Sequence, residues 1–568
     1  MWTILEFHVW RLVFITVFCA AAYKVSAIYG VYVIFWICLL PAKITHRALY
    51  VVTIISVSII ILGNMFFQLQ FISPELKYNC TFNSYMNQNG AYFNHVNLVL
   101  LCAHSLQLCP LVKHMHYQPF FMTSQGFMAI ILMILFERVI MLRQQWHLKW
   151  RNIVQPTMTA FYPTVTWQEL DLGIVEFLKY FVNFAFYKFG VEACFVMSVV
   201  TVWVRADMYA VVYALLLIIA LSLKTRLSLH RYWKFYSIIL LFLLILQYLI
   251  CIGMPPVWCV SHNYPWLVFG SNETERDRLV RWMFLPDYLV LKNSTILIAD
   301  FFQFLFIVSQ LYVFEWEKSG WERYGGDNSY LTGAELDHVT IGTNPRKNFI
   351  FEARSLLDQL KSFVFKYMIW VSMAMVFIAG TTRISLFCLG YIVAFFYLLS
   401  KQQELLLGKP SRLLKVWNVV LGYNVAVITL KISLQIASCV YIETLQENAC
   451  AVVQLFSLVC SKSGAYGLQV AATSTCELSY TNSGLTWDFI CFLFLLIQRR
   501  IFSSYYFLHV TEDLKISLKL AASRGAELFN DKLIEDVKER ESVVQESLRA
   551  LKSSMKSIKN RYRLLRKG

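Results

Sequence analysis

Hydrophobic positions along this chain gather into long runs that are separated by short polar stretches. The clearest example lies between Tyr367 and Leu399, where two apolar runs flank a polar segment with one cation, Arg383. Runs of roughly 18–25 apolar residues are long enough to cross a bilayer as helices. Because a helix satisfies its backbone polar groups internally, this pattern predicts two closely linked helices in lipid.

The same hairpin pattern occurs twice more, around Arg205 and around Lys24. Apolar runs flank each cation on both sides, and Lys24, Arg205 and Arg383 follow one another at intervals of roughly 180 residues. A fixed interval of this kind indicates tandem structural repeats. We therefore expect three repeats, each built around a helical hairpin whose connection carries a cation.

The fold class that follows is all-α: a multi-pass membrane protein of about twelve transmembrane helices in three tandem four-helix repeats, followed by a cytoplasmic amphipathic helix. Each repeat holds an even number of apolar runs, so the chain returns to the side of the membrane that it left. The expected organisation is a four-helix membrane repeat over 1–150, a second over 173–320, a cytoplasmic connecting loop over 321–350, a third repeat over 351–508 and cytoplasmic helices over 509–568.

Composition and charge agree with a membrane protein. Of the 568 residues, 58% are hydrophobic, whereas soluble globular proteins contain about 45–50%. The net charge of +16 does not indicate a nucleic-acid partner, because the lysines and arginines gather in loops on one side of the predicted spans. The positive-inside rule places both termini in the cytoplasm, and it places outside the polar loops that carry the glycosylation candidates Asn79 and Asn272.

The sequence offers no motif of a catalytic or cofactor site. HExxH and GxxxxGK[ST] are absent, as is GxSxG with partner residues, and the 14 cysteines include no CxxC pair. An enzyme embedded in the membrane would need paired catalytic residues on its spans, and the apolar runs do not supply them. We therefore predict no enzyme activity, no cofactor and no metal site, and the pairing of the outside cysteines stays open.

Within the predicted spans we single out three ionisable residues, Lys188, Glu192 and Lys431. A charge in lipid is costly, so it indicates a partner or a function. Lys188 and Glu192 are four positions apart, which puts them on one helix face, where they can form an ion pair. Such a pair either neutralises itself near a helix end or takes part in function. Lys431 has no obvious local partner, so it either reaches the interface, pairs with another repeat or serves transport.

After the last span the sequence changes to a soluble helical pattern, with an expected break near Gly525. Beyond it, apolar positions recur in heptads with polar residues between them. This spacing predicts a long amphipathic helix that needs a partner surface, and its basic flank makes anionic lipid the alternative. The heptads continue to Gly568, which we interpret as truncation, although a terminal glycine also suits a natural end. The apolar seam consists of Val537, Val544, Leu548, Leu551, Met555, Ile558, Tyr562 and Leu565.

Several strings in the chain resemble the Piezo family of mechanosensitive channels. They include FVNFAFYKFGVE at 181–192, FLPDYL at 284–289, FIAGTTRISLFCLGY at 377–391 and LIQRRIFSSYYFLHVTEDLK at 496–515. The strings occur in family order with family-like spacing. The resemblance covers nearly the whole chain and is clearest from residue 173 onward.

The resemblance implies that the chain corresponds to three units of a blade that bends the membrane, and that its last helix begins the family's cytoplasmic beam. It also implies a homotrimer in the plasma membrane, with lipid and other parts of the same channel chain as partners. The family's pore helices and extracellular cap have no match here. We interpret the chain as the force-sensing blade portion of a Piezo-like mechanosensitive non-selective cation channel, without its pore. The alternative is a self-contained secondary transporter, although transporter repeats usually form two halves and often invert.

Overall fold

The computed structural model is helical, with no strand among the residues that it describes. The described residues are 2–23, 25–39, 46–67, 120–151, 161–162, 165–170, 173–223, 225–252, 275–286, 293–318, 320, 322–328, 335, 337, 356–466, 476 and 484–566. Lys24 and both glycosylation candidates, Asn79 and Asn272, lie outside these residues, as does most of the connecting loop 321–350.

Among the described residues, four apolar helices lie in each of three successive stretches of the chain, which we name the first, second and third unit. The first unit holds α1 (Trp2–Tyr23), α2 (Ala27–Leu39), α3 (His46–Phe67) and α5 (Phe120–Trp150). The second unit holds α6 (Ile174–Arg205), α7 (Met208–Ser222), α8 (Arg226–Ile252) and α11 (Leu297–Lys318). The third unit holds α14 (Leu356–Thr381), α15 (Leu386–Leu407), α16 (Pro410–Ser433) and α20 (Leu485–Phe502).

Seven helices among the described residues are long and apolar enough to cross a membrane, which confirms an all-α multi-pass membrane protein. They include α5, α6, α8, α11, α14, α15 and α16. Four shorter apolar segments belong to α1, α2, α3 and α7. α20 combines 18 residues with three charged side chains, Asp488, Arg499 and Arg500. The expected number of about twelve spans is therefore not confirmed and stays a prediction.

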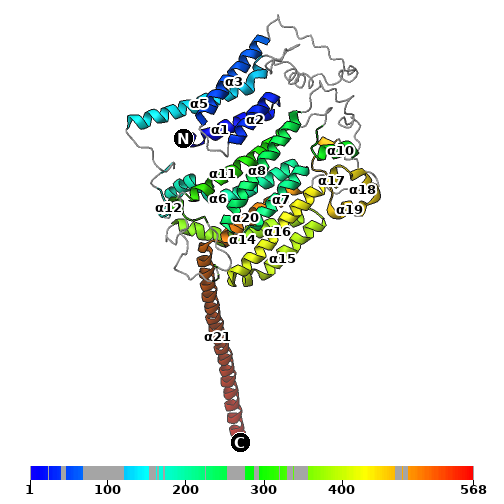
Figure 1. Cartoon of the computed structure of the whole chain (residues 1–568). Helices are drawn as coiled ribbons and strands as arrows, with labels where there is room; N and C mark the ends of the chain where they lie inside the picture. The colour runs from blue at the N-terminus through cyan, green and yellow to red at the C-terminus, as the bar shows by residue number, and fades with distance from the viewer. Residues whose placement is uncertain are drawn as a thin grey trace.

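The units repeat the same contacts, both internally and with each other. Within each unit the first helix packs along the fourth: α1 on α5, α6 on α11 and α14 on α20. Between units, the second helix contacts the third helix of the following unit, α2 with α8 and α7 with α16. The first helix also contacts the fourth helix of the following unit, α1 with α11 and α6 with α20. The units consequently lie side by side in chain order (Figure 1).

Each unit turns tightly between its first and second helix, and a side-chain cap starts the second helix. A cap oxygen stabilises a helix start because the first backbone amides have no partner within the helix. The caps are Ser26, which accepts from the backbone N–H of Tyr29 at 3.2 Å, Asp207, which accepts from Ala210 at 3.1 Å, and Ser385, which accepts from Cys388 at 3.3 Å.

Buried tryptophans join the third helix to the fourth in two of the units. The indole N–H of Trp233 in α8 donates to the carbonyl oxygen of Ile307 in α11 at 3.1 Å. Likewise, Trp417 in α16 donates to the carbonyl oxygen of Leu495 in α20 at 2.9 Å. Both indoles are almost completely buried. Each hydrogen bond therefore fixes the register of two packed helices in a setting without water.

The last helix, α21 (Tyr505–Leu565), contains 61 residues and leaves the bundle as a single rod (Figure 1). Its buried residues all lie between Tyr505 and Thr511. The expected break near Gly525 is wrong, because α21 runs through this position. A glycine inside a helix costs only about 1 kcal/mol relative to alanine, which is too little to interrupt a helix of this length.

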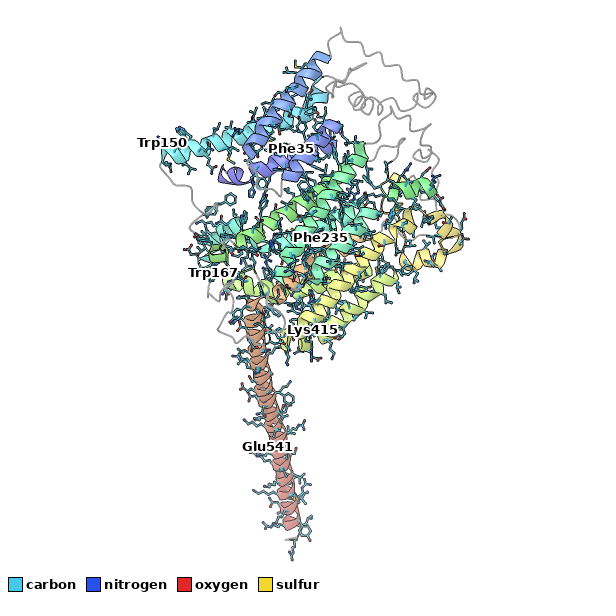
Figure 2. The ribbon with its side chains drawn as sticks, viewed as in Figure 1. Phe35, Trp150, Trp167, Phe235, Lys415 and Glu541 are labelled. Carbon is cyan, nitrogen blue, oxygen red and sulfur yellow. A yellow bond between two sulfur atoms is a disulfide. The ribbon has the colours of Figure 1, made fainter. Side chains whose placement is uncertain are left out.

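The predicted apolar seam lies on the projecting part of α21. Its eight side chains are all exposed, from 46% at Val537 to 81% at Leu565. Figure 2 shows side chains projecting from both sides of α21, with Glu541 labelled along it. The seam is thus an exposed apolar stripe on a single helix, whereas such stripes are normally buried against another element.

Candidate functional site

The three hairpins share a sequence signature that the structure makes visible. A cation stands two residues before the cap of the second helix, and a tyrosine stands six residues after the cap. The three sets are Lys24, Ser26 and Tyr32; Arg205, Asp207 and Tyr213; and Arg383, Ser385 and Tyr391. In each unit the tyrosine hydroxyl bonds a side chain of the third helix: Tyr32 with Ser56 at 2.7 Å, Tyr213 with Gln247 at 3.0 Å and Tyr391 with Asn424 at 2.9 Å.

In the second unit this signature forms a closed cluster of charges around Arg205. The guanidinium Nη2 donates to Asp207 Oδ2 at 2.8 Å, and Nη1 donates to Gln247 Oε1 at 2.7 Å and to the carboxylate of Asp300. All four side chains are buried, and Arg205 is only 2% exposed. Its guanidinium also lies 5.1 Å from the ring of Phe284, within the FLPDYL string.

A cation held between two carboxylates is the arrangement that a buried arginine requires. The removal of charges from water is expensive, and only close, multiply hydrogen-bonded partners compensate for it. Arg205 joins α6, α7, α8 and α11 through these contacts, so one side chain connects all four helices of the second unit. Chemically, the cluster can hold a fixed geometry but offers no described open position for a ligand.

The third unit builds a different cluster at the same place. Lys431 Nζ lies 2.5 Å from Asp488 Oδ2, and Asn424 donates to the backbone oxygen of Asp488 at 3.0 Å. Arg383 donates to the hydroxyl of Ser457 at 3.5 Å. A small hollow, partly open to the surface, borders on both Arg383 and Lys431.

Lys188 and Glu192, the other two predicted intramembrane charges, have partners on different elements. Lys188 donates to the backbone oxygen of Asp327 at 3.0 Å, just beyond α12 (Glu322–Gly325) in the connecting segment. Glu192 accepts from Arg500 at the end of α20 at 3.2 Å. Their contacts thus tie α6 to the connecting segment and to the third unit.

The carboxylates Asp300 and Asp488 were missed by sequence reasoning, although both lie within predicted spans. A signal for them existed in the repeat itself. Each stands near the start of the fourth helix, seven residues before the carbonyl that accepts from the tryptophan of its unit. The spacing between the two carboxylates matches the interval of roughly 180 residues that relates the hairpin cations.

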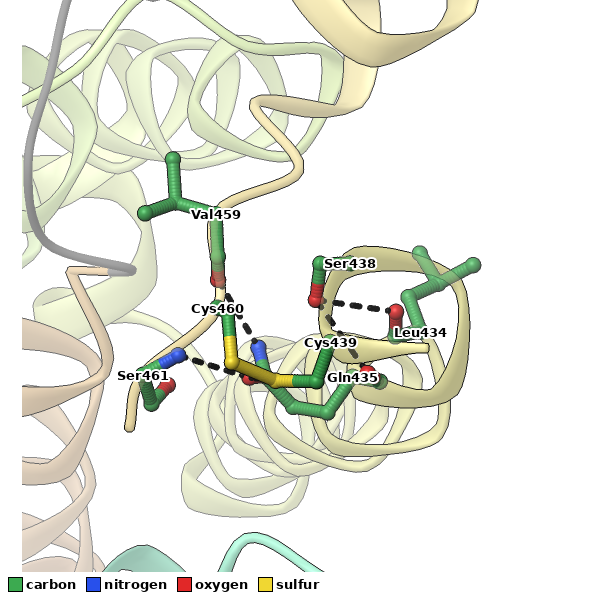
Figure 3. The surroundings of a disulfide bond; sticks show 7 residues. All are labelled: Leu434, Gln435, Ser438, Cys439, Val459, Cys460 and Ser461. Atoms are coloured by element: carbon green, nitrogen blue, oxygen red, sulfur yellow. Dashed lines mark hydrogen bonds between the residues drawn. A yellow bond between two sulfur atoms is a disulfide. The ribbon is translucent and has the colours of Figure 1, made fainter. Parts of the chain in front are cut away.

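A disulfide-linked module covers one end of the third unit. It comprises α17 (Gln435–Cys439), α18 (Ile442–Asn448) and α19 (Cys450–Phe456), and disulfides join Cys439 to Cys460 and Cys450 to Cys476. Figure 3 shows the first of these bonds beside Gln435, whose side-chain oxygen accepts from the backbone N–H of Ser461 at 3.0 Å.

This module also contacts the second unit. Arg278 on α10 (Glu275–Trp282) forms an ion pair with Glu443 at 2.7 Å. Trp282 packs with the disulfide residues Cys439 and Cys460 in a small apolar cluster. The loops that follow the third helix in neighbouring units are thereby joined outside the helix bundle.

The described residues contain no group of three or more histidine, cysteine, aspartate or glutamate side chains that could hold a metal ion. The buried charges instead pair with one another across helices. The fold is that of an all-α multi-pass membrane protein, and polar contacts join its helices near the hairpins at Arg205 and Arg383.

Comparison with known proteins names the family. Residues 337–568 match the family model described as Piezo TM25-28. The chain is 36% identical over 560 residues to Piezo-type mechanosensitive ion channel component 1 of Mus musculus, and 33% identical over 569 residues to that of Homo sapiens. The Drosophila melanogaster Piezo-type component is 28% identical over 581 residues. The chain belongs to the Piezo family.

The matched portion is nearly the whole chain but a small part of each relative. It covers 98% of this chain against the mouse and fly proteins and 100% against the human protein, and 22% of each relative. These relatives are ion channel components rather than enzymes. At this level the chain is a Piezo-like membrane segment, and what it contributes to a channel is a matter for proposal.

Proposed function

We propose that this chain is the force-sensing blade portion of a mechanosensitive, non-selective cation channel. The observation that carries the proposal is the repeated inter-unit contact, α2 with α8 and α7 with α16. Units joined in series through equivalent interfaces can form a curved array whose shape follows the membrane. Tension favours the state with the larger in-plane area, by as much as the two states differ.

The projecting helix α21 would transmit the movement of such an array away from the membrane. α21 starts at the Ser504 cap directly after α20, and its first turns are buried against the third unit. A tilt of the third unit would therefore be carried along a continuous rod. The seam residues from Val537 onward would dock on other parts of the channel chain. The family resemblance of the sequence implies a homotrimer around a pore outside this segment, and we propose this assembly.

We propose that the protein lies in the plasma membrane with both termini in the cytoplasm. Basic loops support this orientation through the positive-inside rule. The two disulfides provide separate support, since such bonds persist in oxidising compartments and are rare in the cytosol. The disulfide module would then face outside, on the same side as the sequons at Asn79 and Asn272.

A chimera tests the proposal. The aligned segment of the mouse relative is replaced by this chain, and pressure-gated current is recorded in cells without other stretch-activated channels. We expect the chimera to conduct under pressure, whereas the relative with the segment deleted and this chain alone do not. A chimera that reaches the cell surface without pressure-gated current would contradict the blade role, and current from this chain alone would contradict the absence of a pore.

A further inference from the structure

Arg500, on the last turn of α20, contacts the second unit. It lies four residues before Ser504, the cap from which α21 starts. Its guanidinium Nη1 donates to Glu192 Oε1 of α6 at 3.2 Å. Its guanidinium carbon Cζ lies 5.8 Å from the centre of the Phe189 ring, which is also on α6. A residue next to the start of α21 is therefore held by a helix of the preceding unit.

This ion pair is largely removed from solvent. The side chains of Arg500 and Glu192 are 18% and 14% exposed. An exposed pair of long charged side chains contributes little, because water screens it and both side chains lose conformational freedom. Burial reduces the screening, and the loss of one partner then leaves the other charge in an unfavourable environment. The pair can therefore fix the position of the end of α20 relative to α6.

One turn earlier, α6 also holds the segment that leads from the second unit to the third. Lys188 Nζ donates to the backbone oxygen of Asp327 at 3.0 Å. Asn328 Nδ2 donates to the backbone oxygen of Tyr187 at 2.8 Å and to Glu317 Oε1 at 2.9 Å. α6 therefore contacts the chain before the third unit begins and again where that unit continues into α21.

Two glycines allow this segment to lie close to α6. A Cβ at Gly325 would lie only 2.8 Å from the ring of Tyr187, and Gly326 has a φ of 78°, a conformation that glycine adopts without strain. The hydroxyl of Tyr180 donates to the backbone oxygen of Gly325 at 2.6 Å. The sequence thus provides α6 with a specific seat for the connecting segment, in addition to its contact with Arg500.

The third unit holds the first turns of α21 through a separate contact. The hydroxyl of Tyr506 donates to Asp358 Oδ1 of α14 at 2.6 Å. Lys361 Nζ, also on α14, lies 5.3 Å from the centre of the Tyr506 ring. The start of α21 is thus held near two units, by α14 directly and by α6 through Arg500. A variant that breaks the contact with α6 leaves the contact with α14 in place, so the two effects can be separated.

We propose that Glu192 and Arg500 are positioning residues for α21, so that α6 of the second unit, together with the third unit, determines how the start of this helix is held. The consequence for a channel rests on the function proposed above. Movement of the second unit would then reach α21 directly through α6, as well as through the third unit. The positioning role itself does not depend on that function.

Hydrogen exchange in the purified 568-residue chain tests the positioning role without a channel. The amides of residues 505–511 report on the start of α21, and residues 521–540, which are exposed, serve as the reference. Glu192→Arg places two cations against each other, so exchange at the start of α21 should accelerate by about fivefold or more. Addition of Arg500→Glu restores opposite charges in reversed order and should return exchange to within about twofold of the native rate.

Glu176→Gln is the matched control, because Glu176 pairs with Lys179 of α6 itself at 2.7 Å. It should leave exchange at the start of α21 unchanged. If Glu192→Arg lowers the helix content, measured by circular dichroism, Glu192→Gln replaces it. Its effect should then disappear when Arg500→Gln is already present. Unchanged exchange in the Glu192 variant, or acceleration that the change at Arg500 does not relieve, overturns the proposal.

The chimera with the mouse relative measures the consequence for gating. At the pressure that half-opens the native chimera, Glu192→Arg should lower the ratio of open to closed channels by about fivefold, while the maximal current is retained. Addition of Arg500→Glu should restore the ratio, and Glu176→Gln should not change it. If charge reversal restores exchange but no chimera conducts, the force-sensing function fails and the positioning role stands. If the chimera conducts and Glu192→Arg responds like the native chimera, the second unit does not act on α21 through this contact.

Discussion

The helix bundle and α21 differ in how their side chains are packed. In the bundle, buried charges such as Arg205 and Lys431 have carboxylate partners, and buried indoles donate to backbone carbonyls of a neighbouring helix. In α21, the described residues from Ile516 onward are exposed, and they include the apolar seam. The bundle is therefore stabilised by contacts between its own helices. The apolar seam of α21, in contrast, is exposed and can pack against a partner.

The comparison predicts its largest effect at the centre of the second unit. Arg205→Met leaves Asp207 and Asp300 buried without their cation, and the loss of one partner of a buried ion pair costs about 3–5 kcal/mol. We expect a decrease of that size in the unfolding free energy, measured by tryptophan fluorescence in denaturant. Arg524→Met, on the exposed part of α21, is the matched control and should change little. Equal losses of unfolding free energy in the two variants would contradict the proposed difference between the helix bundle and α21.

The second prediction concerns the module outside the bundle. Replacing both Cys439 and Cys460 by alanine removes a bond across a sequence separation of 21 residues. The expected loss is about 3 kcal/mol, and it should appear as faster proteolysis of α17–α19. The Arg205 cluster does not contain this bond, so the transition of the second unit should remain. If the whole bundle unfolds together with the module, the module is not a separate part of the fold.

A third prediction tests the equivalence of the second and third units. Trp233→Phe and Trp417→Phe each delete one hydrogen bond between the third and fourth helix while retaining an aromatic ring. Such bonds contribute about 0.6 kcal/mol on average, and at most about 1.7 kcal/mol, in a membrane protein. The two variants should lose similar amounts of unfolding free energy. A loss of unfolding free energy in only one variant would show that the equivalent hydrogen bonds of the second and third units do not contribute equally to stability.

The helical membrane class could be predicted from the sequence, because long apolar runs depend only on local order. The roles of the hairpin cations and of the seam on α21 rest on the same kind of spacing, and they stay predictions. The partner of Lys431 could not be predicted in this way, since Asp488 reaches it only through the packing of α16 against α20. The same holds for the cysteines, because four of them allow three pairings and only the fold selects one.

The continuity of α21 shows the opposite error, in which local reasoning was given too much weight. Gly525 has a low helix propensity, and this led to the expected break. A single unfavourable residue is outweighed by favourable neighbours on both sides, since propagation of a formed helix is easier than its nucleation. Propensity at one position is thus weaker evidence than the amphipathic pattern that continues beyond it.

The smallest expected effect on the chain itself lies on the seam. Leu551→Glu with Ile558→Glu replaces exposed side chains, 62% and 63% accessible, so the unfolding free energy should change by no more than about 0.5 kcal/mol. In the chimera with the mouse relative, the same pair should abolish pressure-gated current, because two carboxylates cannot pack into an apolar interface. Neutralisation of three basic side chains on the flank is the matched control and should leave the current intact; these are Lys552, Lys556 and Lys559. If the lysine changes remove the current and the seam changes do not, anionic lipid rather than protein is the surface on which α21 rests.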